Sequence, residues 1–288
     1  VSDADATFTH ASGNAYAGYS FDGGDADGDG QSEVVVSAYG ALTAVGQVGV
    51  WNGTGVGGAE TFASTATALI SGSTTAGNFG YSVAVGDLDG DDMVDLLVGA
   101  PATASTSTPG ALYIFTGFDA LAGAVSVSSA FSTISGSTNA DRFGYAVSFI
   151  GDSDGDGTNE FIVSADKHDG SAVDAGSAYV ISGAPSGAST GAALADTLIR
   201  GEVTGDFFGR TVAGVGDSNN DSYADVMIGA TSYDWFDGST TWSGAGAAYF
   251  FYGPLASGTI SASTYDAQFT GANTADAVGA ALQGGGDV

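Results

Sequence analysis

The sequence contains no cysteine, so neither a disulfide bond nor a thiolate metal site is available to this chain. It also lacks any apolar run near the ~20 residues that a membrane-spanning helix requires, and we expect no direct insertion into a membrane. No signal peptide is visible, and the chain begins with Val1 rather than methionine. This beginning favours a processed protein or a fragment.

Basic residues are almost as scarce as cysteine. The 288 residues include only four lysines and arginines against 33 aspartates and glutamates, which gives a formal net charge of −29. Such a surface repels nucleic acids and anionic membranes, so we expect neither as a partner. High ionic strength screens self-repulsion of this kind, and the acidity therefore favours a saline or extracellular setting. The four basic residues are Arg142, Lys167, Arg200 and Arg210.

What the chain has in abundance is repetition. A phrase that opens with aspartate returns at intervals of 62 to 70 residues, with acidic or amide side chains at its positions 1, 3, 5 and 9. Repeats of this length indicate an array of similar structural units. A fifth copy opens at Asp287, next to the last residue. The four complete copies are DADGDGQSE (25–33), DLDGDDMVD (87–95), DSDGDGTNE (152–160) and DSNNDSYAD (217–225).

The short apolar runs around each acidic phrase are typical of β-strands. They hold four to eight residues, are rich in Val, Ile, Tyr and Phe, and are bounded by Gly, Asn, Asp and Ser. In the second unit they predict strands at 81–86, 95–100, 111–116 and 131–135. Four short strands per repeat indicate a propeller blade, in which the acidic phrase joins the first two strands. We therefore predict an all-β fold with one β-propeller region over residues 1–288.

The register divides this region into four complete units and two partial ones. Residues 1–10 match the last strand of a preceding unit, and residues 270–288 begin a further unit. A closed four-bladed ring would not need both, so we expect a part of a longer array. The complete units cover approximately residues 11–70, 71–134, 135–199 and 200–269.

Two motifs beside the acidic phrase carry a resemblance to a known family. In unit two, Phe79-Gly80 precedes the phrase and Gly99-Ala100-Pro101 follows it. Together with the loop 87–95, these motifs resemble the FG-GAP repeats of the integrin alpha-subunit propeller and its bacterial or archaeal relatives. The resemblance covers essentially the whole chain and implies a propeller of seven blades. Unit one departs from it at Ala17-Gly18, and the Gly-Ala-Pro motif is altered in units one, three and four.

The acidic phrase predicts one calcium site in each complete unit. Side chains at positions 1, 3 and 5 of a tight loop converge, and a carbonyl at position 7 with a carboxylate at position 9 completes an oxygen shell that suits Ca²⁺. Position 4 is Gly or Asn, which accept the left-handed backbone that this turn requires. The predicted ligands are Asp25, Asp27, Asp29, the carbonyl of Gln31, and Glu33; Asp87, Asp89, Asp91, the carbonyl of Met93, and Asp95; Asp152, Asp154, Asp156, the carbonyl of Thr158, and Glu160; and Asp217, Asn219, Asp221, the carbonyl of Tyr223, and Asp225.

Other interpretations of these loops are weaker. An EF-hand needs a glutamate at position 12 and flanking helices, whereas position 12 is apolar here and a strand follows. Mg²⁺ is disfavoured because a cage of many carboxylates suits the larger ion. Solvated turns stay open as an alternative, since Asp, Asn and Gly are common turn formers. Four copies in register favour calcium, in a structural role that relieves repulsion among the carboxylates.

The loop at 231–244 is unusually aromatic. Tyr233, Trp235, Phe236 and Trp242 could supply rigid area for contact with a protein or glycan partner. Packing against a neighbouring blade or subunit is the alternative.

These observations predict an extracellular or cell-surface, calcium-binding β-propeller that mediates recognition or adhesion. Its partner would be a protein or glycan, or copies of the chain itself. No nucleophile elbow, phosphate loop or zinc pattern occurs, and we expect no enzymatic activity. Two alternatives stay open. One is a structural subunit of a surface layer, sheath or filament, and the other is an accessory propeller of a secreted enzyme.

Overall fold

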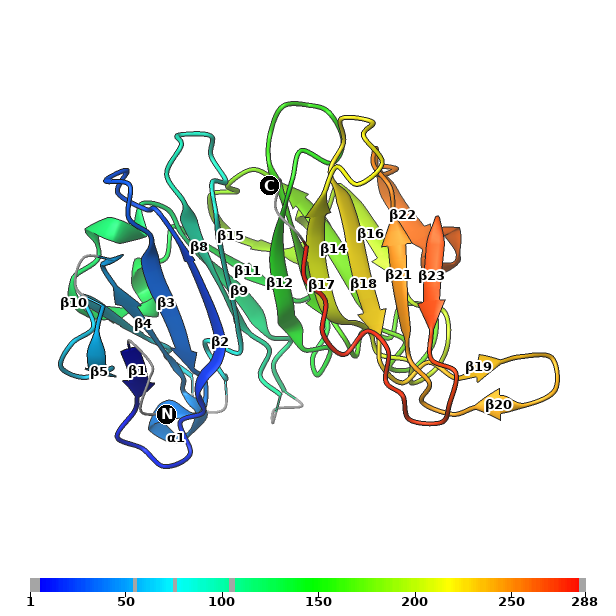
Figure 1. The fold of residues 1–288 in the computed structure, drawn as a ribbon, viewed down its shortest axis with the longest axis horizontal. Helices are drawn as coiled ribbons and strands as arrows, with labels where there is room; N and C mark the ends of the chain where they lie inside the picture. Colours follow the sequence, from blue (N-terminus) through cyan, green and yellow to red (C-terminus); the bar gives the residue numbers. More distant parts are fainter. Residues whose placement is uncertain (1–5, 54–55, 75–76, 104–106, 285–288) are drawn as a thin grey trace.

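The computed structural model describes residues 6–53, 56–74, 77–103 and 107–284. Four twisted sheets follow one another side by side in the order of the sequence (Figure 1). In each sheet four consecutive strands pair in antiparallel fashion, as in a propeller blade. The all-β, propeller-type architecture predicted from the sequence is thereby confirmed.

The strands of unit two begin and end within one residue of the sequence prediction. Acidic residues open the second strand of every blade, directly after the acidic loop. Blade 1 contains β2 (Ala17–Gly24), β3 (Glu33–Ala38), β4 (Gln47–Trp51) and β6 (Ala68–Ser71); blade 2 contains β7 (Ser82–Gly86), β8 (Asp95–Ala100), β9 (Ala111–Phe115) and β11 (Ser132–Ser135); blade 3 contains β12 (Phe143–Gly151), β13 (Glu160–Ala165), β14 (Ser177–Ser182) and β16 (Thr197–Arg200); blade 4 contains β17 (Phe208–Gly216), β18 (Asp225–Ala230), β21 (Ala247–Phe251) and β23 (Ala267–Thr270).

A short parallel strand from the following unit extends the outer edge of three blades. β10 (Gly123–Ser126) pairs with β6, β15 (Gly187–Thr190) with β11, and β22 (Gly258–Ser261) with β16. At the N-terminal side β1 (Ala6–Thr9) pairs in the same way with β5 (Gly58–Thr61). Backbone hydrogen bonds therefore join each blade to the next along its outer edge.

The remaining elements are short and lie in the connections between strands. Two of them, β19 and β20, form a separate hairpin beyond β18. These elements are α1 (Ala41–Ala44), η2 (Phe118–Ala120), η3 (Val127–Ser129), α2 (Gly191–Leu194), β19 (Trp235–Phe236), β20 (Thr241–Trp242) and η4 (Ala262–Thr264).

The Phe-Gly and Gly-Ala-Pro motifs are packing positions between blades. Phe143 is buried in a cluster that joins Leu112 of blade 2 to Val163 of blade 3. Gly144 has a φ of +87°, and a Cβ there would lie 2.4 Å from the carbonyl oxygen of Ala111. A Cβ on Gly99 would lie 2.1 Å from the carbonyl oxygen of Gly144. Glycine at both motifs therefore lets the backbones of adjacent blades come into direct contact, because a side chain at either position would clash.

The first strands of the four blades surround a common cavity of about 350 Å³. The residue after the motif glycine lines it in every blade, and neighbouring members of this set contact one another. The rings of Tyr19 and Tyr81 lie 4.9 Å apart, as do those of Tyr81 and Tyr145. The guanidinium of Arg210 lies 5.1 Å from the ring of Tyr145. These contacts show that the first strands of successive blades lie next to one another and face the same cavity.

Candidate metal centres

The four acidic loops lie in a row at one end of the blades, along the upper edge of Figure 1. Each loop joins the first and second strands of its blade. The loops also bond one another directly, because each of the first three accepts a hydrogen bond from the next on the carbonyl of its first residue. The donors are the N–H of Val94 to Asp25 at 3.4 Å, Nδ2 of Asn159 to Asp87 at 2.8 Å, and the N–H of Ala224 to Asp152 at 2.8 Å.

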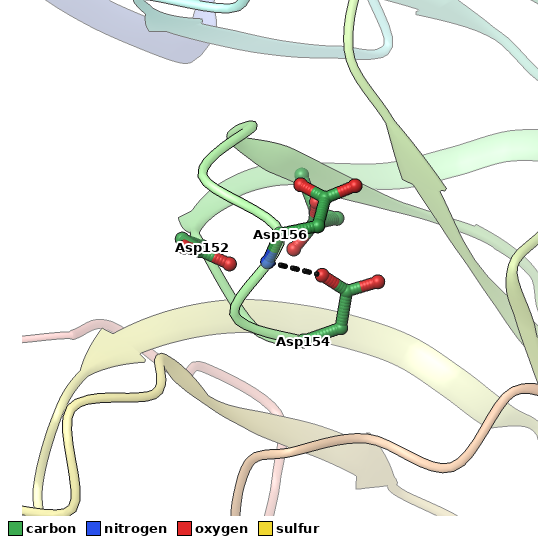
Figure 2. Close-up of side chains that lie close together, drawn as sticks. Asp152, Asp154 and Asp156 are labelled. Carbon is green, nitrogen blue, oxygen red and sulfur yellow. Dashed lines mark hydrogen bonds between the residues drawn. The ribbon is translucent and has the colours of Figure 1, made fainter.

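The aspartates at positions 1, 3 and 5 organise each loop by accepting hydrogen bonds from its own backbone. In the third loop, Asp152 accepts from the N–H of Gly155 at 2.6 Å and of Gly157 at 3.0 Å. Asp154 accepts from the N–H of Asp156 at 3.1 Å, the dashed contact in Figure 2. Asp156 accepts from the N–H of Thr158 at 2.7 Å. The loop wraps around its own carboxylates, which brings three of them together (Figure 2).

The left-handed backbone expected at position 4 is confirmed, with φ of +84° at Gly155 and +62° at Asn220. Position 6 is left-handed as well, which the sequence analysis missed. Two loops have glycine there, but Asp92 and Ser222 adopt φ of +67° and +77°. These two residues carry backbone strain that a glycine would not.

The carboxylate at position 9 is buried in all four loops. Glu33 and Asp95 are each 2% exposed, Glu160 is 1% exposed and Asp225 is fully buried. Each accepts a hydrogen bond from the backbone N–H at position 2, at distances between 2.6 and 3.0 Å. This residue therefore fixes the start of the loop to the start of the second strand, a role that the sequence analysis did not assign.

Three of the loops gather carboxylate oxygens into groups whose members all lie within 4.8 Å of one another. The third loop brings together all four of its predicted acidic ligands. In the first loop Glu33 stands outside the group, and in the second Asp91 does. The groups are Asp25, Asp27 and Asp29; Asp87, Asp89 and Asp95; and Asp152, Asp154, Asp156 and Glu160.

The fourth loop is arranged differently. Asp217, Asp221 and Asp225 form no such group among the described residues. The amide nitrogen of Asn219 donates instead to the carboxylate of Asp221 at 2.8 Å. The Asp221 carboxylate is thus already paired with an amide donor in this loop.

The position-7 residues are held in the same way in every loop. Their N–H groups donate to the position-5 carboxylates, at distances between 2.7 and 3.0 Å. These residues are Gln31, Met93, Thr158 and Tyr223.

Crowding and burial make ionisation of two carboxylates in the second loop costly. Burial raises the pKa of Asp95 to about 6, and the charges of Asp89 and Asp91 add to this effect. Burial also raises the pKa of Asp89, together with the charges of Asp91 and Asp87. Oε1 of Glu160 is buried without a hydrogen-bond partner. An all-oxygen, anionic set with an unpaired buried oxygen fits a hard divalent cation, which would satisfy these groups.

The aromatic loop forms a hairpin at the opposite end of blade 4, at the lower right of Figure 1. Trp235 pairs with Trp242 across the hairpin, and Phe236 is 61% exposed. Tyr233 lies outside the hairpin, with its ring 6.3 Å from that of Tyr249. The structure thus brings three of the four predicted contact residues together and places the fourth against blade 4.

A carboxylate closes the turn of this hairpin. Asp237 accepts hydrogen bonds from Oγ of Ser239 and the N–H of Thr240, both at 2.8 Å, and from Nε1 of Trp242 at 3.2 Å. The bond from the Ser239 hydroxyl is the main reason that the pKa of Asp237 is lowered to about 2.

Comparison with known proteins identifies the repeat. A profile of the FG-GAP repeat matches residues 79–115, which contain the Phe-Gly pair, the second acidic loop and the Gly-Ala-Pro motif. Integrin alpha-V of Gallus gallus is 29% identical over 225 residues, 77% of this chain and 20% of that protein. The chain therefore contains an FG-GAP repeat at residues 79–115.

Further relatives of this FG-GAP protein are also integrin alpha subunits. Integrin alpha-PS2 of Drosophila melanogaster is 30% identical over 230 residues, 77% of this chain and 16% of that protein. Human integrin alpha-IIb is 33% identical over 229 residues, 75% of this chain and 20% of that protein. The matches therefore span a fifth or less of the length of these relatives. Within the part of the chain that the structure describes, no helix is long and apolar enough to cross a membrane.

Proposed function

We propose that this FG-GAP protein is an extracellular, calcium-binding β-propeller that mediates recognition or adhesion at a cell surface. The observation that carries the proposal is the third acidic loop. Four carboxylates lie together there, and one of their oxygens is buried without a partner. The similarity to integrin alpha subunits supports the assignment to recognition rather than catalysis.

Calcium would be held by the oxygen ligands predicted for each loop. The third loop offers Asp152, Asp154, Asp156 and Glu160, and the carbonyl of Thr158 would add a neutral ligand. The first and second loops offer three gathered carboxylates each. The fourth loop would bind more weakly, because Asn219 replaces one carboxylate and donates to another.

The proposed role of the ion is structural. Each loop joins two strands of its blade, and each of the first three accepts a hydrogen bond from the next loop, so an ion there would fix a hairpin and its neighbour together. Modules of this kind bind calcium at roughly 10⁻⁴–10⁻³ M outside cells. An extracellular setting would therefore keep the loops loaded, and it also suits the formal net charge of −29.

The proposed contact surface is the β19–β20 hairpin. It presents Trp235, Phe236 and Trp242 at the end of the blades opposite the acidic loops (Figure 1). Phe236 is exposed, and Trp235 and Trp242 are half-buried beside it. Accessible aromatic rings of this kind anchor many protein and glycan interfaces.

The proposal is tested by applying the protein in solution to an immobilised panel of extracellular-matrix proteins and glycans and measuring its capture. We expect capture in millimolar Ca²⁺, its loss in chelator, and its loss in the Trp235→Ala, Phe236→Ala double variant. Phe21, 74% exposed on blade 1, supplies the control substitution Phe21→Ala, which leaves capture unchanged. Capture that persists in chelator and in the hairpin variant would contradict the proposal.

A further inference from the structure

A cavity of about 200 Å³ lies outside the acidic loops, between the outer edge of blade 3 and blade 4. Its lining comes from the connection after β16, from η4, and from strands of blade 4. This volume is smaller than the ~300–1,000 Å³ of pockets that hold drug-sized ligands. The cavity suits a small group rather than a large one.

Aromatic rings form its walls. Tyr249 stands at the centre of the set, with its ring 5.3 Å from Phe208, 6.3 Å from Tyr233 and 5.5 Å from Tyr265. All four rings line the cavity. The faces of aromatic rings are electron-rich and attract cations.

A buried carboxylate completes the cavity. Asp206 lines it and is only 6% exposed, yet no described residue donates a hydrogen bond to its side chain. Burial, with the charge of Asp234 added, raises the pKa of Asp206 to about 7. Burying a carboxylate without a hydrogen-bond partner costs free energy. A cationic ligand bound to Asp206 would reduce this cost.

The corresponding carboxylate of blade 3 has an imidazole beside it within the chain. Asp141 occupies the same place in its unit, two residues before the motif phenylalanine, and Nε2 of His168 lies 3.9 Å from it. In blade 4, Tyr233 stands at the position of His168, and each N–H donates to the alanine that ends the second strand. Compared with blade 3, blade 4 therefore has no basic side chain at this position and has an aromatic ring that lines the cavity instead.

A second carboxylate lies at the exposed side of the cavity. Glu202 accepts hydrogen bonds from the hydroxyls of Ser261 and Ser263, the latter at 2.9 Å. No lysine or arginine lines the cavity, although Arg200 lies beside Glu202 in an adjoining depression. The cavity therefore combines aromatic walls with negative charge.

We propose that this cavity binds an alkylammonium ion, with the ammonium group on Asp206 and its alkyl carbons against the tyrosine rings. A charged N–H donor would complete the unpaired carboxylate, and the rings would add cation–π attraction. The ion could be a free small amine or the lysine side chain of a partner protein. The site is separate from the calcium loops and does not depend on them.

Ligand-observed NMR titration in saturating Ca²⁺ tests this inference. The probes are n-butylammonium as a free amine, Nα-acetyl-lysine-N-methylamide as a peptide lysine, and n-butanol as the neutral counterpart. We expect at least one of the two cations to bind at least tenfold more tightly than n-butanol. Binding of the free amine alone identifies a small-molecule site, and binding of the lysine derivative identifies a partner's lysine.

Matched variants locate the binding. Asp206→Asn is expected to weaken it at least tenfold, and Tyr265→Ala to weaken it severalfold. Asp266→Asn removes the same charge from the neighbour of Tyr265, outside the cavity, and should leave affinity within twofold. Equal binding of n-butanol and both cations, no binding of either cation, or unchanged binding in Asp206→Asn would overturn the inference. Melting curves of each variant confirm that it is folded.

Discussion

Replacing Glu160 with glutamine should lower the stability of the protein in the presence of calcium but not in its absence. Oε2 of Glu160 accepts hydrogen bonds from the N–H and the hydroxyl of Ser153, at 2.6 and 2.8 Å. The glutamine carbonyl can keep both of these bonds. The new amide group takes the place of Oε1, which is buried and unpaired. The substitution therefore keeps the shape of the site and removes one negative charge from a group of four.

Without calcium the lost charge should be neutral or stabilising, because burial and the neighbouring Asp154 already oppose its ionisation. With calcium the same change removes an ionic ligand. An ion at a hundredfold excess over its dissociation constant stabilises the folded state by about 2.7 kcal/mol per site. A tenfold loss of affinity would reduce this contribution by about 1.3 kcal/mol. For a chain of 288 residues this corresponds to about 2 °C in melting temperature.

Differential scanning calorimetry of Glu160→Gln and the parent protein, each in Ca²⁺ and in chelator, measures both effects. Asp119→Asn is the control, since it removes one charge from η2, outside the acidic loops. We expect the gain in melting temperature from calcium to shrink in Glu160→Gln and to be unchanged in Asp119→Asn. An equal gain in all three proteins would refute the argument for the third loop.

Four further substitutions give three more predictions. Asp92→Gly should raise stability by about 0.5 kcal/mol in urea titrations, because relief of its left-handed backbone exceeds the extra entropy that glycine loses; a lower midpoint would contradict this. Arg210→Met should cost roughly 1–3 kcal/mol, since Arg210 lies 2.6 Å from the fully buried Asp166, whereas Lys167→Met should cost under about 1 kcal/mol; equal losses would count against the argument. Asp206 has its pKa raised to about 7 in the folded protein, so it contributes stability that is present below pH ~4 and lost as pH rises through about 7. Asp206→Asn should therefore be less stable than the parent at pH 4 relative to pH 8, and a pH-independent difference would contradict this assignment.

The strands of the blades could be predicted because their residues follow simple rules. In unit two the apolar runs and the glycines that bound them locate all four strands to within a residue. Phe143 and Gly144 also show why the motif recurs, since one fills the space between blades and the other lets backbones touch. Local composition and the repeated packing motif are therefore enough to predict the strands of the blades.

The features that the sequence did not predict depend on contacts between distant segments. β10, β15 and β22 are four residues each and largely exposed, so their pairing rests on backbone hydrogen bonds to another unit. No pattern of side chains signals such a strand. The separation of Tyr233 from the aromatic hairpin likewise depends on Tyr249, sixteen positions further along the chain.

In the acidic loops, spacing predicted which side chains gather but not how each is held. The recurring position-9 carboxylate was predicted as a ligand, and its burial and its bond to position 2 appear only in the folded hairpin. Two loops have glycine at position 6, which is consistent with a left-handed backbone there. The other two have Asp92 and Ser222, so the sequence did not indicate that this position is left-handed in every loop. The fifth copy at Asp287 and residues 1–5 of the first partial unit lie outside the described residues, and the division into units and the seven-bladed ring stay predictions.

The most direct test of the central claim is the number of calcium ions bound by chelator-treated protein, measured by equilibrium dialysis at fixed ionic strength with and without excess Mg²⁺. We expect at least three calcium ions to bind per chain at millimolar calcium and a fourth to bind with lower affinity. We expect magnesium to displace little of this calcium. No saturable binding at millimolar calcium, or full displacement by an equal concentration of magnesium, would show that the acidic loops are turns rather than calcium sites.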